Sequence, residues 1–174
     1  MFLLERLPNN RLYTSKYKPF GLLRKIDASD VSRTDVLTTG VASLDKISWG
    51  DLFYESKANG YEVYVVDDGT CIAGFVKLKV REGHSIRIDV VATDAKYQGR
   101  GVGGALLRFA ETVGRSNQCV YLDLWAIGDK VAMYSDMGYA HVGETIDTGN
   151  GEGYTYMRKE LLYHFALEDE HTHR

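Results

Sequence analysis

The stretch that decides the fold reads Tyr97-Gln-Gly-Arg-Gly-Val-Gly-Gly104, which places four glycines within six residues. Apolar residues then recur at helical spacing as far as Val113, so a helix begins here. Glycines at such a start let a ligand approach the backbone, and the unpaired N–H groups of a first helical turn attract an anion, typically a phosphate. Because each glycine costs the helix up to about 1 kcal/mol relative to alanine, the pattern predicts an anion-binding loop rather than a flexible connection.

The residues before this loop alternate as strands do. Three runs, at 61–66, 72–81 and 85–93, are separated by the short turns Asp67-Asp-Gly69 and Glu82-Gly83, which predicts an antiparallel meander. In the second run the apolar residues are expected on one face and the basic residues on the other. The apolar set is Ile72, Val76, Leu78 and Val80, and the basic set is Lys77, Lys79 and Arg81. The third run is expected to turn Ile86, Ile88 and Val90 inward.

The residues after the loop predict a crossover. The helix leads to a strand at 120–124, and a strand–helix–strand connection makes its two strands parallel. A short helix over 129–137, ended by Gly138, and two strands at 139–146 and 154–161 follow. The sequence therefore predicts an α/β fold.

The residues upstream of the meander predict a short strand at 21–26 and then a helical region with loops that ends near Ala58. Ser29 or Asp30 is the expected N-cap of that region. The whole chain is expected to form one domain. Its expected parts are an irregular basic arm at 1–20, the domain body, and a polar tail at 163–174, together spanning 1–174.

Composition excludes several classes of protein. The 174 residues are 44% apolar and 26% charged, which is ordinary for a globular domain. No apolar run approaches the roughly 20 residues that span a bilayer, and Glu5 and Arg6 interrupt what would be the apolar part of a signal peptide. We therefore expect a cytoplasmic protein that does not contact a membrane. Cys71 and Cys119 lie in apolar runs and are expected to be reduced core thiols.

Charge is unevenly distributed over a net −3. Residues 1–26 carry six basic side chains and one acidic one, a pattern that we interpret as a solvated edge, so no nucleic-acid partner is expected. The acidic remainder of the chain favours a cationic substrate over an anionic one. His171 and His173 lie in the polar tail, where they are expected to be solvated, and no metal site is expected.

The glycine loop has two interpretations. Gly99-x-Gly101-x-x-Gly104, with Asp123 further on, matches the dinucleotide-binding fingerprint. That fingerprint follows its strand almost directly and opens a parallel sheet. Here residues 94–98 intervene and an antiparallel meander precedes the loop, so a dinucleotide site is the weaker alternative.

The second interpretation begins one residue earlier, at Gln98-x-x-Gly101-x-Gly103. At this motif the chain resembles the GNAT superfamily of N-acetyltransferases, in which Q/R-x-x-G-x-G/A is the pyrophosphate loop for acetyl-CoA. The later segment Ala132-Met-Tyr134-Ser-Asp-Met-Gly-Tyr139 is similar to the family's A-x-Y-x-x-x-G-F/Y segment. The resemblance extends over the order of elements from about residue 21 to residue 162.

The resemblance implies a GNAT-type fold, with a mixed and largely antiparallel sheet and helices on both of its faces. It implies acetyl-CoA as the acetyl donor, no metal, and direct attack of a primary amine on the thioester in a ternary complex. The acceptor stays open between small-molecule amines and peptide or protein amines, and a homodimer is one of the assemblies left open. A non-catalytic acyl-CoA-binding module of the same fold is the alternative function.

The resemblance also assigns site residues. Val91, Ala92 and Thr93 would pair through their backbone with the pantetheine arm, and the Val91 amide would polarise the thioester carbonyl. Tyr134 would donate a proton to the departing sulfur. The loop residues that would hold the pyrophosphate are Gln98, Gly99, Arg100, Gly101, Val102, Gly103 and Gly104. One departure is that Ile127-Gly128-Asp129 stands where members often carry an asparagine, and Asp129 is expected to be a helix N-cap.

The general base is expected to be Asp89, which lies two residues before Val91 and is therefore expected on the same face of its strand. The other reading of Asp89 is a structural aspartate that is ion-paired, for example with Arg87. Asp123 on the neighbouring strand is the second choice, and a water relay is the third.

Aromatic residues offer a wall for an amine acceptor. Trp125 and the cluster of Trp49, Phe53 and Tyr54 would contact it through cation–π interactions. Packing in the core is the alternative role of these side chains.

Overall fold

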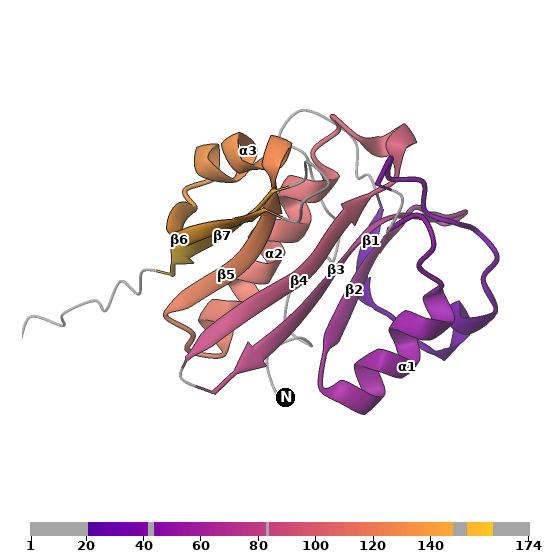
Figure 1. Ribbon diagram of the computed structural model, residues 1–174. Helices are drawn as coiled ribbons and strands as arrows, with labels where there is room; N and C mark the ends of the chain where they lie inside the picture. Colours follow the sequence, from indigo (N-terminus) through magenta and orange to yellow (C-terminus); the bar gives the residue numbers. More distant parts are fainter. Residues whose placement is uncertain (1–20, 42–43, 83, 148–152, 162–174) are drawn as a thin grey trace, which may run out of the picture.

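One mixed sheet organises the molecule. The computed structural model describes residues 21–41, 44–82, 84–147 and 153–161, so the basic arm, the polar tail and its two histidines lie outside the described residues. Seven strands lie in the order β1-β2-β3-β4-β5-β7-β6 (Figure 1). Their bounds are β1 Leu22–Lys25, β2 Glu62–Asp67, β3 Ile72–Arg81, β4 Ser85–Thr93, β5 Tyr121–Ile127, β6 Ala140–Asp147 and β7 Gly153–Glu160. Neighbours pair antiparallel except for β4 and β5, which pair parallel, so the predicted meander and crossover are confirmed.

Helices cover both faces of this sheet, as predicted. Their bounds are α1 Trp49–Asn59, α2 Val102–Ser116 and α3 Val131–Asp136, with short 3₁₀ turns η2 Ala28–Ser32, η3 Ala95–Tyr97 and η4 Gly128–Lys130. One core, which we call the α2-side core, joins α2 and α3 to the sheet, and Leu106 and Leu122 are fully buried in it. Helix α1 lies on the opposite face of the sheet from α2 (Figure 1). The α1-side core lies beneath it and contains Trp49 and Phe75. In the described part of the chain, no helix has the length and apolar character needed to cross a bilayer.

Side-chain N-caps mark where the 3₁₀ turn η2 and the helix α1 begin. The predicted N-cap at Ser29 or Asp30 is wrong, because the Asp27 carboxylate accepts the Ser29 N–H at 2.7 Å and Asp30 reciprocates by accepting the Asp27 N–H at 3.0 Å. The expected helical region is also divided, since η2 ends at Ser32 and α1 starts only after the Ser48 cap. Gly60 ends α1 in the left-handed conformation, at φ 68°.

A bulge on β4 reverses which side chains face which core. β3 and β4 pair Lys77 with Val90 and Leu78 with Ile88, so Asp89 is one extra residue on β4. Ile88 therefore packs in the α2-side core, whereas Val90 packs against the α1-side core. The prediction that Val90 faces inward with Ile86 and Ile88 is wrong for this reason.

Two further corrections concern β3. The pairing of β2 with β3 shifts at Asp67, and Ile72 packs in the α1-side core rather than beside Val76. Lys77 is buried rather than solvent-facing, because it lies beneath α1 with 8% of its surface exposed.

The two cysteines differ from one another. Cys119 is buried in the core as predicted, but Cys71 is only half-buried, because it lies in the turn before β3. Its Sγ lies 3.0 Å from Lys96 Nζ and 3.3 Å from the Tyr97 hydroxyl. Neither thiol forms a disulfide.

The parallel pair separates before its strands end. Paired residues of β4 and β5 stop at Ile88 and Leu124, although β4 continues to Thr93 and β5 to Ile127. Figure 1 shows the two strands diverging toward their carboxyl ends. A gap in hydrogen bonding thus opens inside the sheet, next to the start of α2.

Candidate functional site

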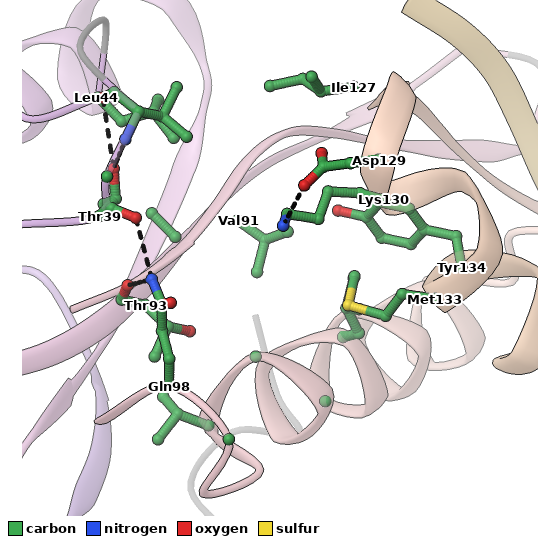
Figure 2. Close-up of a pocket in the computed structure, with 18 of the residues that line it drawn as sticks. Thr39, Leu44, Val91, Thr93, Gln98, Ile127, Asp129, Lys130, Met133 and Tyr134 are labelled. Atoms are coloured by element: carbon green, nitrogen blue, oxygen red, sulfur yellow. Dashed lines mark hydrogen bonds and ion pairs between the residues drawn. The ribbon is translucent and has the colours of Figure 1, made fainter. Parts of the chain in front are cut away.

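A cleft of about 890 Å³ occupies the place where β4 and β5 diverge. Its walls come from residues 39–41 with Leu44, from 91–93 on β4, from the loop and first turns of α2, and from 127–134 around α3 (Figure 2). It therefore joins the end of one parallel strand, the start of the crossover helix and the segment after the other parallel strand. This is the region of an α/β sheet where ligands usually bind.

The glycine loop is shaped by two residues with positive φ. Gly99 has φ 71° and Gly101 has φ 87°, conformations that glycine adopts without steric cost. Gln98, just before these glycines, attaches the loop to its surroundings. Its side-chain amide donates to the Thr39 carbonyl at 2.9 Å and to the Thr93 carbonyl at 3.2 Å. Gln98 thus holds the loop against both neighbouring walls of the cleft.

The first turn of α2 forms an open cradle of backbone amides. The first intrahelical bond at this end runs from the Ala105 N–H to the Gly101 carbonyl at 3.0 Å, so the N–H groups before Ala105 have no acceptor one turn earlier in the helix. A β-carbon on Gly103 would lie 3.3 Å from Thr93 Oγ1, which means that only glycine keeps this space clear. Backbone donors without a covering side chain, at the positive end of a 15-residue helix, fit the phosphates of acetyl-CoA.

The predicted loop residues divide into two groups. Gln98, Gly99, Gly101, Val102, Gly103 and Gly104 line the cleft. Arg100 is exposed and is not among the lining residues, and its guanidinium carbon lies 5.7 Å from the centre of the Tyr97 ring. Its contact with a phosphate remains a prediction.

The end of β4 has a backbone edge that no strand of the described chain covers, and one carbonyl there, that of Thr93, accepts a hydrogen bond from Gln98. Val91, Ala92 and Thr93 all line the cleft, as the sequence predicts, and on their other side they pair with Val76, Phe75 and Gly74 of β3. Because β5 has diverged at this level, the cleft-facing edge of β4 can accept an extended ligand as an added strand.

Tyr134, the predicted proton donor, is one of the residues that line the cleft. It lies on α3 and is 7% exposed, and its ring packs edge-on against Tyr139 at 5.7 Å between centres. Figure 2 shows its hydroxyl directed into the cleft, toward Val91. Burial raises the pKa of Tyr134 to about 12, so its hydroxyl is protonated at neutral pH.

Asp89 lies outside the cleft lining, contrary to the geometry expected from the sequence. The bulge turns its side chain toward the α1 side, where it lies 3.6 Å from Lys77 Nζ and accepts a hydrogen bond from Tyr61, whose pKa it raises. The prediction that Asp89 and Val91 share a face is therefore wrong. Its ion-pair partner is Lys77, not Arg87, whose guanidinium packs on the Tyr156 ring at 5.3 Å.

The other predicted side chains have structural partners of their own. Asp123 is buried and accepts a 2.7 Å hydrogen bond from Arg158 Nε. Trp125 is 38% exposed and packs against Tyr156 with the ring centres 5.0 Å apart and the ring planes tilted by 44°. The aromatic cluster does not form one wall, because Trp49 is buried in the core with its indole N–H donating to the Asp35 carbonyl at 2.7 Å.

Two walls of the cleft were not predicted. At the start of α3, Asp129 does not cap a helix but pairs with Lys130 Nζ at 2.7 Å, and both line the cleft. The spacing of Lys130, four residues before Tyr134, is a signal that could have identified it. The wall at 39–41 and Leu44 has no periodic pattern that would have revealed it. In the described part of the chain, no group of three or more His, Cys, Asp or Glu side chains is arranged to bind a metal.

Comparison with known proteins gives one family. The model of the acetyltransferase (GNAT) family matches residues 34–139. Among solved structures, the chain is similar to Ard1 from Thermoplasma volcanium, with 16% identity over 83% of this chain and 99% of that one and a TM-score of 0.64. It is also similar to a GNAT family acetyltransferase from Elizabethkingia anophelis with acetyl-CoA bound, with 17% identity over 82% and 99% and a TM-score of 0.61. Among curated protein sequences, nothing matches significantly.

Proposed function

The chain belongs to the acetyltransferase (GNAT) family, and we therefore propose that it transfers an acetyl group from acetyl-CoA to a primary amine within a ternary complex. The observation that carries this proposal is the cleft itself: an uncovered turn of backbone amides, a free strand edge and a tyrosine hydroxyl face one space. Acetyl-CoA supplies the activated acetyl thioester. The residues of the chain bind it, orient it and manage the protons.

The loop, the end of β4 and Tyr134 bind acetyl-CoA and polarise its thioester. The first-turn amides of α2 and the helix dipole hold the pyrophosphate, while the free edge of β4 from Val91 to Thr93 pairs with the amide groups of the pantetheine arm. The Val91 N–H donates to the thioester carbonyl oxygen, where negative charge develops. The Tyr134 hydroxyl donates to sulfur as its bond to carbon breaks.

The acceptor amine must lose a proton before or as it attacks. Asp89 is the better candidate for accepting that proton, because 28% of its side-chain surface is exposed. Asp123 has 3% of its side-chain surface exposed and its carboxylate already accepts from Arg158. Since Asp89 does not line the cleft, we propose that it acts through a water molecule on the α1 side of the sheet.

Two measurements test this function. Thermal unfolding with acetyl-CoA and with NAD should show stabilisation by acetyl-CoA alone, because binding to the folded state adds stability as ligand is added. Release of free CoA thiol should then be measured against a panel of polyamines, aminoglycosides, amino acids, peptides with a free N-terminus and lysine peptides. Binding without thiol release on any amine would favour the non-catalytic acyl-CoA-binding module, and stabilisation by NAD alone would favour a dinucleotide site.

A further inference from the structure

Lys130 brings an amine into the donor cleft. It is the one lysine among the described residues that line this cleft, and 51% of its side-chain surface is exposed. Lys130 precedes Tyr134 by four residues at the start of α3, so the two side chains lie on one side of this segment. Figure 2 shows the Lys130 ammonium and the Tyr134 hydroxyl both directed toward Val91.

Two other lysines of the described chain, Lys77 and Lys159, are held in buried or half-buried ion pairs. Lys77 is buried and bonds Glu55 at 2.7 Å, and Lys159 bonds Glu111 and the Met137 carbonyl, each at 2.8 Å. The Lys130 ammonium is held by the neighbouring Asp129, at 2.7 Å, in an exposed pair. An exposed pair of this kind is weak, so it leaves the Lys130 amine free to move within the cleft.

We propose that Lys130 is an acetyl acceptor of its own protein, modified by the acetyl-CoA bound beside it. This rests on the proposed function, because it requires acetyl-CoA with its thioester between Val91 and Tyr134. The ammonium first releases one proton to water. The Nζ lone pair then forms a bond to the acetyl carbonyl carbon, the bond from that carbon to sulfur breaks with its electron pair going to sulfur, and the proton that the amine loses ends on the thiol of CoA. The products are N-acetyl-Lys130 and free CoA.

The closeness of the lysine to the bound acetyl-CoA compensates for the small fraction of amine that is neutral. A lysine amine in water is neutral in about one molecule per thousand near pH 7.4. Well-oriented groups within one complex react as if at an effective concentration of about 10⁵ M or more. Because the donor is bound beside the lysine, the rate of acetylation of Lys130 should saturate with acetyl-CoA.

The experiment uses the full chain and no added acceptor. The protein is incubated with acetyl-CoA, and peptide mass spectrometry follows acetyl occupancy at Lys130 and at Lys57. Lys57 is the matched control, because it is an exposed lysine on α1 outside the cleft lining. Lys130 should be acetylated at least about tenfold faster than Lys57, with a rate that does not depend on protein concentration.

Each other outcome overturns the proposal in a distinct way. If acetyl-CoA stabilises the protein and amines release CoA, but Lys130 is acetylated no faster than Lys57, only the self-acetylation of Lys130 is wrong. If the rate rises with protein concentration, transfer occurs between molecules and the proposed geometry is wrong. If acetyl-CoA does not stabilise the protein at all, the proposed function and this inference both fail.

Discussion

Two tyrosines at α3 differ in what surrounds their hydroxyl groups. Tyr134 directs its hydroxyl into the cleft, whereas the Tyr139 hydroxyl is fully buried and has no hydrogen-bond partner among the described residues. The two rings touch edge to face, but their hydroxyl groups have different surroundings. Removing each hydroxyl in turn therefore separates a role of the hydroxyl in the reaction from a role of the ring in packing.

Tyr134→Phe should reduce turnover and leave the fold intact. The change keeps the ring contact with Tyr139 and removes the group that donates to sulfur. We expect turnover to fall at least tenfold, or about 1.4 kcal/mol of transition-state stabilisation, with melting temperature and acetyl-CoA affinity almost unchanged. Steady-state kinetics with chemistry rate-limiting measures this, and unchanged turnover would reduce Tyr134 to a packing residue.

Tyr139→Phe is the control for that measurement. An unpaired buried hydroxyl costs the folded state about 1–3 kcal/mol, so removing it should hold or raise the melting temperature. Turnover should remain at the wild-type level. A loss of turnover equal to that of Tyr134→Phe would show that the packing of α3, rather than a specific hydroxyl, limits the reaction.

Gly103→Glu should abolish stabilisation by acetyl-CoA. The new side chain would lie against Thr93 Oγ1, which is 3.3 Å from the β-carbon position, and would bring a negative charge to the phosphate site. Gly50→Glu is the control: it adds the same charge on α1, where a β-carbon meets only ordinary contacts at 3.6 Å. Thermal unfolding across an acetyl-CoA titration checks both variants, and unchanged affinity in Gly103→Glu would refute the loop assignment.

Asp89→Asn tests the base. If Asp89 accepts the amine proton through water, the rate at neutral pH should fall by a factor of about 100 to 10,000, and it should partly recover at high pH, where free amine becomes abundant. A pH–rate profile measures this. Asp123→Asn should instead lower the melting temperature, because it weakens the buried pair with Arg158. A wild-type rate in Asp89→Asn would remove Asp89 from the mechanism.

At the scale of elements, one ion pair fixes α3 to the rest of the domain. Lys159 of β7 donates to Glu111 of α2 and to the carbonyl of Met137, which ends α3. Glu111 is 6% exposed. The position of Tyr134 in the cleft therefore depends on a contact that joins three elements far apart in the sequence.

Lys159→Met should destabilise the protein by leaving the Glu111 carboxylate buried without its main partner. Breaking a buried pair on one side costs about 3–5 kcal/mol, so the urea midpoint should fall clearly. Adding Glu111→Gln to the same protein should restore part of the loss, because it removes a buried charge whose remaining partner, Arg115, lies 3.4 Å away. Equal stability of Lys159→Met and wild type would show that the contact contributes nothing to holding α3.

At the scale of the whole molecule, a second charged cluster joins strands β1 and β2 to the 3₁₀ turn η2. Arg24 of β1 bonds both carboxylate oxygens of Asp30 at 2.7 Å and also bonds Asp67 of β2 at 2.7 Å. Asp30 is 1% exposed. Burial raises the pKa of this carboxyl, but the hydrogen bonds from Arg24 and from the Asp27 backbone outweigh it, so the pKa is lowered overall.

This cluster predicts how stability depends on pH. A carboxyl whose pKa is lower in the folded state contributes stability that is present above its unfolded pKa of about 3.9 and is lost as pH falls through the folded value. The free energy of unfolding should therefore be level near neutral pH and decline below about pH 4. Arg24→Gln should lower stability at neutral pH and flatten the acid decline, as urea titrations at several pH values would measure. An acid profile unchanged by Arg24→Gln would exclude this cluster as the cause.

The sequence by itself determined the order of elements, the loop and its helix, and the position of Tyr134. These features are local: alternation gave β4 its bounds at Ser85–Thr93, and glycines marked the start of α2, because both depend on neighbours a few residues away. The helical crossover between β4 and β5 then predicted that these strands are parallel, and parallel strands place their carboxyl ends at the same edge of the sheet, where the cleft opens.

Only the tertiary structure decided where the flanking side chains point. The extra residue at Asp89 exists through its pairing with β3, and one residue of register moves a side chain to the opposite face of a sheet. The wall at Thr39 is held through Gln98, 59 residues away, and Asp123 is engaged by Arg158, 35 residues away. Contacts between residues so far apart produce no periodic pattern in the sequence, because they depend on how the packed elements meet. The residues that line the cleft could therefore be identified in full only from the tertiary structure.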